Sequence, residues 1–250
     1  MHVVRGQLSD PADDRAVTRQ LTTLVADTGE PAVRAWTPPR QVAFGRRDAT
    51  ANGYERARAA ATERGYTPIE RSVGGHAVAH TGETVAFAYV VSDNDRSGIQ
   101  TRYQDTTGLL KRALETVGVT VRRGEPDDAY CPGEYSLQHD GKIAGIAQRV
   151  RRDAAVVGGC VTVRETDEAD IAAVLVPVYD ALCVPFDPDS VGSVEGAGGP
   201  ADPRRVTRAI ESVLVGGRER TVHAAENLLQ RDSRRSPSVI SEEPRHGVER

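Results

Sequence analysis

Residues 70–80 read ERSVGGHAVAH, a glycine-centred turn between two strand-like segments. Two adjacent glycines permit a backbone conformation that other residues resist, and they allow a ligand to approach the main chain closely. The exposed amides of such a turn can bind an anion or a carbonyl oxygen. Arg71 can hold a carboxylate or a phosphate, and the small side chains of Ala77 and Ala79 leave room for an apolar ligand. On spacing alone, an ordinary hairpin turn explains the same residues.

A second informative segment, residues 130–148, reads YCPGEYSLQHDGKIAGIAQ. Cys131 precedes a Pro-Gly pair, which places it in a loop rather than in a core strand. Lys142 follows an Asp-Gly pair typical of a tight hairpin and begins a strand of small residues. If the two side chains meet, the ammonium group lowers the pKa of Cys131 and creates a nucleophile for acyl transfer. Lys142 could equally polarise a substrate carbonyl. Taken alone, the residues also fit an inert loop thiol and a solvated lysine.

Outward from these segments, helices alternate with hairpin-like groups of strands. Capped or amphipathic segments predict helices at 11–27, 54–64, 98–117, 168–180, 203–214 and 219–230. Apolar and alternating segments predict strands at 2–7, 32–36, 41–45, 67–71, 76–80, 84–92, 135–139, 143–149 and 154–164, the first of them at a sheet edge. Residues 187–203 predict a long loop. This order favours an α+β fold with a mixed or antiparallel sheet flanked by helices.

The composition excludes several classes of protein. The 250 residues carry 32 basic and 36 acidic side chains, a formal net charge of −4, which gives no whole-chain reason to expect nucleic acid. No apolar run is long enough for a membrane span, and the first residues lack the apolar core of a secretion signal. Three cysteines fit a reducing compartment, so a cytoplasmic protein is expected. We expect one domain over residues 1–230 and a disordered tail over 231–250.

Other reactive side chains have simpler explanations. Cys160 lies in an apolar strand and Cys183 lies near a proline, so both are expected to pack as small hydrophobic residues. The cysteines lack the spacing of zinc ligands, and no further ligand stands near His76 and His80, so no metal site is predicted. The basic run at 149–152 is either a docking patch for an acidic partner or a solvated face.

Together and in this order, the two segments resemble the superfamily of lipoate–protein ligases and octanoyltransferases, which also includes biotin–protein ligases. The ligand loop of that superfamily reads roughly RR-x-[ST]-GG-x-A-V-x-H and corresponds to residues 70–80. Its lysine motif, GK-x-x-G-x-A-Q, corresponds to residues 141–148. The segment VAFGR at 42–46 is similar to a family strand that ends in GR, and Trp36 matches a preceding Trp. The resemblance covers about residues 10–180 and implies a catalytic domain of the biotin–lipoate ligase type.

The departures from the family pattern place the chain closest to the cysteine-dependent octanoyl and lipoyl transferases. Glu70 replaces an arginine, His76 replaces a third glycine of the ligases, and residues 130–135 are similar to a cysteine loop of the transferases. The resemblance implies that Cys131 carries the acyl group as a thioester and that Lys142 lowers its pKa. The implied acyl-binding residues are Arg71, Ser72, Gly74, Gly75, His76, Ala77, Val78, His80 and Gly145.

The resemblance also implies partners. These are lipoyl-domain proteins, namely the acyltransferase subunit of 2-oxoacid dehydrogenases and the glycine cleavage H protein, with an acyl carrier protein as a further possible donor. A transferase requires no cofactor, because octanoate or lipoate enters as a substrate. The alternative within the superfamily is an ATP- and magnesium-dependent lipoate ligase with a separate accessory subunit, in which Cys131 has no role. The alternative outside enzymes is a non-catalytic protein that binds lipoate or biotin.

Overall fold

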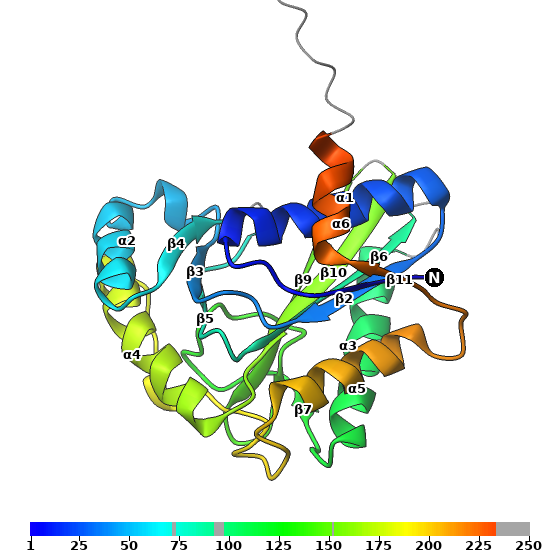
Figure 1. The fold of residues 1–250 in the computed structure, drawn as a ribbon. Coiled ribbons are helices and arrows are strands. Elements are labelled where there is room, and N and C mark those ends of the chain that lie inside the picture. Colours follow the sequence, from blue (N-terminus) through cyan, green and yellow to red (C-terminus); the bar gives the residue numbers. More distant parts are fainter. Residues whose placement is uncertain (72–73, 93–97, 152, 234–250) are drawn as a thin grey trace, which may run out of the picture.

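A computed structural model describes residues 1–71, 74–92, 98–151 and 153–233, with residues 231–233 described by their backbone only. Its strands and helices form an α+β fold, as predicted (Figure 1). The described strands belong to two sheets, one large and one small. Two of the predictions, Ser72 in the ligand loop and the greater part of the tail (residues 234–250), lie outside the described residues.

The larger sheet is mixed, with eight strands among the described residues. In spatial order they are β11 (Thr221–Ala224), β1 (His2–Arg5), β2 (Ala32–Trp36), β6 (Val85–Ser92), β10 (Ala154–Val161), β9 (Lys142–Val150), β8 (Leu137–Gln138) and β7 (Arg122–Arg123). β1 is parallel to both of its neighbours, and the strands from β2 to β7 pair in antiparallel fashion. At the centre, Gly159 of β10 lies between Phe87 of β6 and Ile146 of β9.

The smaller sheet carries the glycine-centred loop. Its strands are β4 (Thr67–Glu70), β3 (Gln41–Phe44) and β5 (Val78–His80), with β3 in the middle, parallel to β4 and antiparallel to β5. Successive side chains of a strand point to opposite faces. Val78 and His80 of β5 therefore line a cavity, while Ala79 between them is 1% exposed.

Helices cover both faces of the larger sheet and flank the smaller one (Figure 1). One face carries α1 (Pro11–Thr28) and α6 (Ala225–Ser233), the other carries α3 (Ile99–Thr116) and α5 (Pro203–Val215), and the smaller sheet packs with α2 (Tyr54–Glu63) and α4 (Glu165–Leu182). Two short 3-10 turns, η1 (Asp48–Thr50) and η2 (Pro188–Ser190), lie in the connecting loops. No described helix is both long enough and apolar enough to cross a membrane.

Helix α1 borders the cavity, and local sequence determines where it begins and ends. Asp10 caps the helix by accepting hydrogen bonds from two main-chain N–H groups of the first turn, and Pro11 occupies the first helical position. Gly29 ends the helix with a φ of 71°. The buried carboxylate of Asp14 accepts a hydrogen bond at 2.5 Å from the guanidinium of Arg34 on β2. This pair fixes α1 to the larger sheet.

The two ends of the chain differ from the prediction. The predicted edge strand at 2–7 is β1, which has a neighbour on each side. The predicted helix at 219–230 is instead a strand, β11, followed by α6. The β-branched residues Thr221 and Val222 pair with His2 and Val3 of β1, so contacts distant in the sequence override local helix propensity.

Candidate active site

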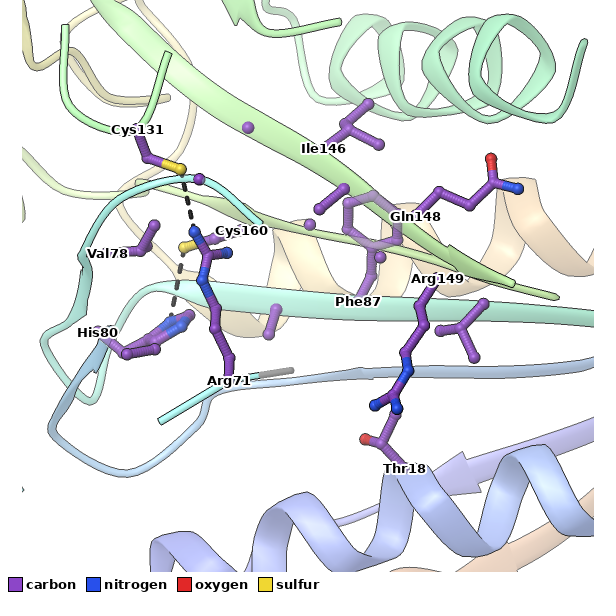
Figure 2. A pocket seen from close by; sticks show the side chains of 18 of the residues that line it. Thr18, Arg71, Val78, His80, Phe87, Cys131, Ile146, Gln148, Arg149 and Cys160 are labelled. Carbon is purple, nitrogen blue, oxygen red and sulfur yellow. Dashed lines mark hydrogen bonds between the residues drawn. The ribbon is translucent and has the colours of Figure 1, made fainter. Parts of the chain in front are cut away.

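A cavity of about 710 Å³ lies where the two sheets approach each other. Residues of β6, β9 and β10 line it from the larger sheet, and residues of β3, β4 and β5 line it from the smaller one. Helix α1 and the loop that contains Cys131 contribute further walls. The dashed lines in Figure 2 mark two contacts in this cavity, from Arg71 to Cys131 and from Cys160 to His80.

Cys131 is held by three groups from different parts of the chain. Arg71 donates a hydrogen bond from Nη2 to Sγ at 3.0 Å. The N–H of Cys131 donates to Oη of Tyr179 at 2.7 Å, and the carbonyl of Cys131 accepts from Nζ of Lys142 at 2.8 Å. Cys131 has a φ of 42°, in the left-handed region, which costs a non-glycine residue about 1–2 kcal/mol. The three contacts therefore stabilise a strained residue in one orientation.

Arg71 supplies the positive charge that contacts the sulfur of Cys131. It directly follows β4, and its N–H donates to the carbonyl of Phe44 at 2.9 Å. Its Nη2 also donates to the carbonyl of His76 at 2.7 Å. A guanidinium stays protonated at all relevant pH values, so it can stabilise a sulfur anion without changing its own charge. In the structure Arg71 binds the sulfur of Cys131 and a main-chain carbonyl. That Arg71 can hold a carboxylate or a phosphate stays a prediction.

The sulfur of Cys131 and the guanidinium of Arg71 both lie next to Gly75. This residue has a φ of 85°, and a Cβ there would lie 2.7 Å from Sγ of Cys131 and 3.1 Å from Nη2 of Arg71. Gly74, its neighbour, has nothing within 4 Å of its own Cβ position. Of the two glycines, Gly75 is therefore the one that the close approach of the sulfur requires.

Lys142 is buried, with 1% of its side chain exposed. Its ammonium group donates to the carbonyls of Tyr130 and Cys131 and to Oε2 of Glu125, each at 2.8 Å. These bonds occupy all three donors of the ammonium group. The sequence suggested that the ammonium meets the thiol, but in the structure it binds the main-chain carbonyl of Cys131 and leaves the sulfur to Arg71.

Glu125 belongs to the site although no motif in the sequence identifies it. Besides Lys142, its carboxylate accepts hydrogen bonds from the N–H of Gly133 at 2.7 Å and from Oγ of Ser136 at 2.9 Å. It therefore ties both sides of the cysteine loop to the buried ammonium group.

Tyr179 of α4 is a second residue that the sequence analysis missed. Its hydroxyl accepts from the N–H of Cys131 and donates to the carbonyl of Ala77 at 3.0 Å. Burial raises the pKa of Tyr179 well above 10, so the hydroxyl keeps its proton. One side chain thus joins the cysteine loop to the glycine-centred loop.

The inner wall of the cavity, meaning the part formed by His80, Phe87, Gly145, Gly159 and Cys160, is uncharged. His80 and Cys160 are in contact there, with 3.6 Å between Nδ1 and Sγ. Burial lowers the pKa of His80 to about 4, and Arg71 adds to this effect. Burial also raises the pKa of Cys160 to about 12. Both groups are therefore neutral near pH 7, which suits a wall that contacts an apolar chain. Cys160 is buried, as expected, but it also lines the cavity.

The structure brings together most, but not all, of the predicted site residues. The cavity is lined by Arg71, Gly74, Gly75, Val78, His80, Cys131, Lys142 and Gly145. Ala77 does not line it, because its side chain packs on the opposite side with Ala79 in the core of the smaller sheet. His76 is also absent from the lining, and its Nδ1 lies 2.8 Å from the buried carboxylate of Asp48. The expectation that Cys183 is packed is wrong, since this residue is exposed.

Curated relatives match part of this chain. An octanoyl-[GcvH]:protein N-octanoyltransferase from Exiguobacterium is 30% identical over 161 residues, which are 63% of this chain and 57% of the relative. A lipoyl-[GcvH]:protein N-lipoyltransferase from Listeria monocytogenes is 30% identical over 119 residues, 47% of this chain and 43% of the relative. The matched part of the chain thus spans about half the length of these relatives.

Solved structures share the fold. A crystal structure of lipoate-protein ligase A bound with ATP superposes with a TM-score of 0.71 at 19% identity, covering 92% of both chains. A putative lipoate protein ligase from T. acidophilum with bound lipoic acid gives a TM-score of 0.65 at 16% identity, again over 92% of both chains. The sequence pattern described as "Lipoyl protein ligase A/B catalytic domain" matches residues 10–194. This chain belongs to the lipoyl protein ligase A/B catalytic domain family.

Proposed function

We propose that this protein is an acyltransferase, which moves an octanoyl or lipoyl group between lysines of carrier proteins through a thioester on Cys131. The observation that carries the proposal is the 3.0 Å contact between Nη2 of Arg71 and Sγ of Cys131 in a cavity with an uncharged inner wall. Family membership supports the class of reaction, since the relatives described above are named for octanoyl or lipoyl transfer from a GcvH protein to a protein.

In the first step, the sulfur of Cys131 attacks the acyl carbonyl of the donor. A C–S bond forms, the C–N bond to the donor lysine breaks, and the thiol proton departs on the donor amine. Arg71 favours this step because a charge-assisted hydrogen bond stabilises the sulfur anion. The acyl chain then lies against the cavity wall formed by Phe87, Gly145 and Gly159.

In the second step, the amine of an acceptor lysine attacks the thioester carbonyl. A C–N bond forms, the C–S bond breaks, and the proton of the amine returns to the sulfur. Bonds and protons balance over the two steps without ATP, because the acyl group enters as an amide of the donor lysine and leaves as an amide of the acceptor lysine. The acylated protein is therefore the substrate, and no resident cofactor is required.

Lys142 and Tyr179 act in this proposal as positioning residues. The first holds the carbonyl of Cys131 and the second holds its N–H, so the sulfur faces the guanidinium of Arg71. Lys142 also adds a positive charge next to the loop, which Glu125 partly neutralises.

The test is intact-protein mass spectrometry after mixing the protein with octanoylated glycine cleavage H protein without ATP. The Cys183→Ala variant is the background, because its exposed thiol would otherwise compete for modification. We expect one octanoyl adduct that maps to Cys131 and is removed by hydroxylamine. Cys131→Ala in the same background should give no adduct and no transfer to an added lipoyl domain.

Arg71→Gln tests the partner of the sulfur. The neutral side chain removes the charge-assisted hydrogen bond, so adduct formation should slow by about tenfold or more. Arg122→Gln, on the exposed strand β7, is the control and should leave the rate unchanged. Full transfer by Cys131→Ala would exclude the thioester route. Modification of the lipoyl domain by free lipoate and ATP alone would instead establish a ligase.

A further inference from the structure

We infer that a group of arginines around the cavity forms a docking surface for an acidic carrier-protein domain. This inference rests on the proposed acyl transfer and identifies the part of the molecule that recognises the protein carrying the acyl group. The group, called the arginine rim, consists of Arg15, Arg19, Arg149 and Arg151, which line the cavity, and of Arg46, whose charge acts on Arg149.

The rim surrounds the cavity from two sides. Arg15 and Arg19 line the cavity from α1, and Arg149 of β9 and Arg151, which directly follows β9, line it from the larger sheet. Figure 2 shows Arg149 pointing towards Thr18 of α1, at the far end of the drawn wall from Cys131. Burial, Arg151 and Arg46 all lower the pKa of Arg149, so the guanidinium groups of Arg151 and Arg46 both lie within electrostatic reach of Arg149.

Three of the five rim arginines have no carboxylate partner in the part of the chain that the structure describes. Arg19, Arg46 and Arg151 form no salt bridge with any residue that the structure describes, and Arg15 donates to the main-chain carbonyl of Glu70. Among the described residues, the carboxylates of Asp14 and Glu70 line the cavity, and Asp14 is already paired with Arg34.

The positive charge of the rim is confined to this part of the surface, because the whole chain has a net charge of −4. A cluster of like charges destabilises the free protein by self-repulsion, and an anionic partner relieves that repulsion. An octanoyl chain is uncharged and cannot be this partner. The rim therefore fits the protein that delivers or receives the chain.

The distances suit one docked domain. Seven residues of extended strand separate Lys142 from Arg149, which is about 23 Å at about 3.3 Å per residue. A protein interface of ordinary size covers about 800 Å² on each partner, an area wide enough to span this separation. At the other end, Arg15 binds the carbonyl of Glu70, the residue before Arg71. A small domain whose lysine reaches Cys131 therefore also covers the rim.

The partner that fits is a small folded domain with aspartate and glutamate side chains around its modified lysine. Complementary charges at the edge of an interface mainly raise the association rate and the specificity, and their effect falls as salt rises. The rim should therefore act on encounter with the carrier protein and leave the chemistry at Cys131 unchanged.

The experiment compares two double charge reversals in the Cys183→Ala background. Arg19→Glu with Arg151→Glu changes exposed rim residues that contact neither Cys131 nor Lys142. The control, Arg205→Glu with Arg208→Glu, makes the same charge change on exposed positions of α5, on the opposite face of the larger sheet from α1 (Figure 1). Acylation of Cys131 is measured with octanoylated H protein and with a small neutral octanoyl thioester, each over a range of salt concentrations.

The rim variant should lose about tenfold or more in kcat/KM with the protein donor and should show a weaker salt dependence. Its rate with the neutral thioester should equal that of the parent, and the control should match the parent with both donors. An unchanged rate with the protein donor, an equal loss with the neutral thioester, or an equal loss in the control would each overturn the docking surface.

Failure of the acyl transfer itself is recognised separately. If neither donor acylates Cys131 in the parent protein, the proposed chemistry fails, and binding of the octanoylated H protein is measured by calorimetry. Weaker binding to the rim variant than to the control still supports the docking surface, and equal binding overturns it.

Discussion

The ammonium group of Lys142 and the carboxylate of Glu125 lie 2.8 Å apart, with 1% and 17% of their side chains exposed. Removing one partner of such a buried pair leaves a charge without compensation, which costs far more than the loss of a surface ion pair. The carboxylate also accepts the N–H of Gly133. The pair therefore connects the start of β9 to the loop that presents Cys131.

Replacing Glu125 by Gln should destabilise the fold and slow acylation of Cys131. Glutamine can keep one hydrogen bond to the loop but cannot neutralise Lys142, so we expect a loss of about 1–3 kcal/mol in the free energy of unfolding, measured by urea denaturation. Glu134→Gln is the control, because that side chain is 70% exposed and pairs with Arg123 at the surface. It should change stability by less than about 0.5 kcal/mol. Equal effects from the two variants would mean that the buried pair has no special role.

Alanine at Gly75 should abolish acylation, whereas alanine at Gly74 should be tolerated. The new Cβ at position 75 would lie 2.7 Å from Sγ of Cys131, and the φ of 85° disfavours any side chain. We expect the rate of adduct formation to fall by roughly a hundredfold or more in Gly75→Ala, because the new methyl group clashes with the sulfur. We expect a change of less than roughly threefold in Gly74→Ala, because the methyl group there enters open space. Thermal unfolding of both variants shows whether the fold is retained. An active Gly75→Ala variant would contradict the observed packing of the sulfur.

Removing the hydroxyl of Tyr179 should release Cys131 from its left-handed conformation. Phenylalanine leaves the N–H of Cys131 and the carbonyl of Ala77 without their partner, which costs about 1–3 kcal/mol. We expect Tyr179→Phe to slow acylation of Cys131 with both the protein donor and the small thioester. Tyr66→Phe, which loses a longer hydrogen bond of 3.4 Å to the carbonyl of Asp170, should acylate at the parent rate.

Acid should destabilise the protein through His80. Burial lowers the pKa of His80 from 6.5 to about 4 in the folded chain, so between these values the unfolded state binds more protons than the folded state. The contribution to stability is complete above about pH 6.5 and is lost as the pH falls towards 4, by about 2–3 kcal/mol. Urea unfolding from pH 7.5 to pH 4.5 measures this loss.

The variant His80→Gln should lack this contribution and show a shallower dependence on pH. His139→Gln is the matched control, because His139 lies at the surface with 44% of its side chain exposed. It should retain the slope of the parent protein. The same slope in His80→Gln would assign the acid sensitivity to other groups.

The sequence was sufficient for the fold class and for the two segments that meet at the cavity, because hydrophobic periodicity and turn residues act locally. It was not sufficient for the partner of the sulfur. Cys131 and Lys142 are close in the sequence and form an obvious pair, whereas Arg71 is sixty residues away and reaches Sγ only because the two sheets approach each other. Tyr179 was missed for the same reason, because it lies 48 residues from Cys131 and binds its main-chain N–H. Glu125 lies only eight residues from Gly133 but belongs to no motif, so local sequence gave no reason to select it.

The alternation of β5 shows a second limit. Small residues at Ala77 and Ala79 suggested space for a ligand, but strand parity directs them into the core of the smaller sheet, while Val78 and His80 face the cavity. The alternation of side chains along a strand shows which residues share a face, but it shows which face is buried only when the other face is exposed. Here both faces of β5 are covered. The identity of the cavity face therefore had to come from the tertiary structure.

The pairing of β1 with β11 has a consequence for the smallest unit that can fold. The N–H of Thr221 donates to the carbonyl of Met1 at 2.9 Å, so the two ends of the described chain are joined within one sheet. A protein trimmed to the family-matched residues 10–194 would lose both strands and helix α5, which covers Val33 and Val85. It would expose β2 as a bare edge open to intermolecular pairing. We therefore expect the folding unit of this protein to be larger than its family-matched segment, with both outer segments required to complete the sheet that borders the cavity.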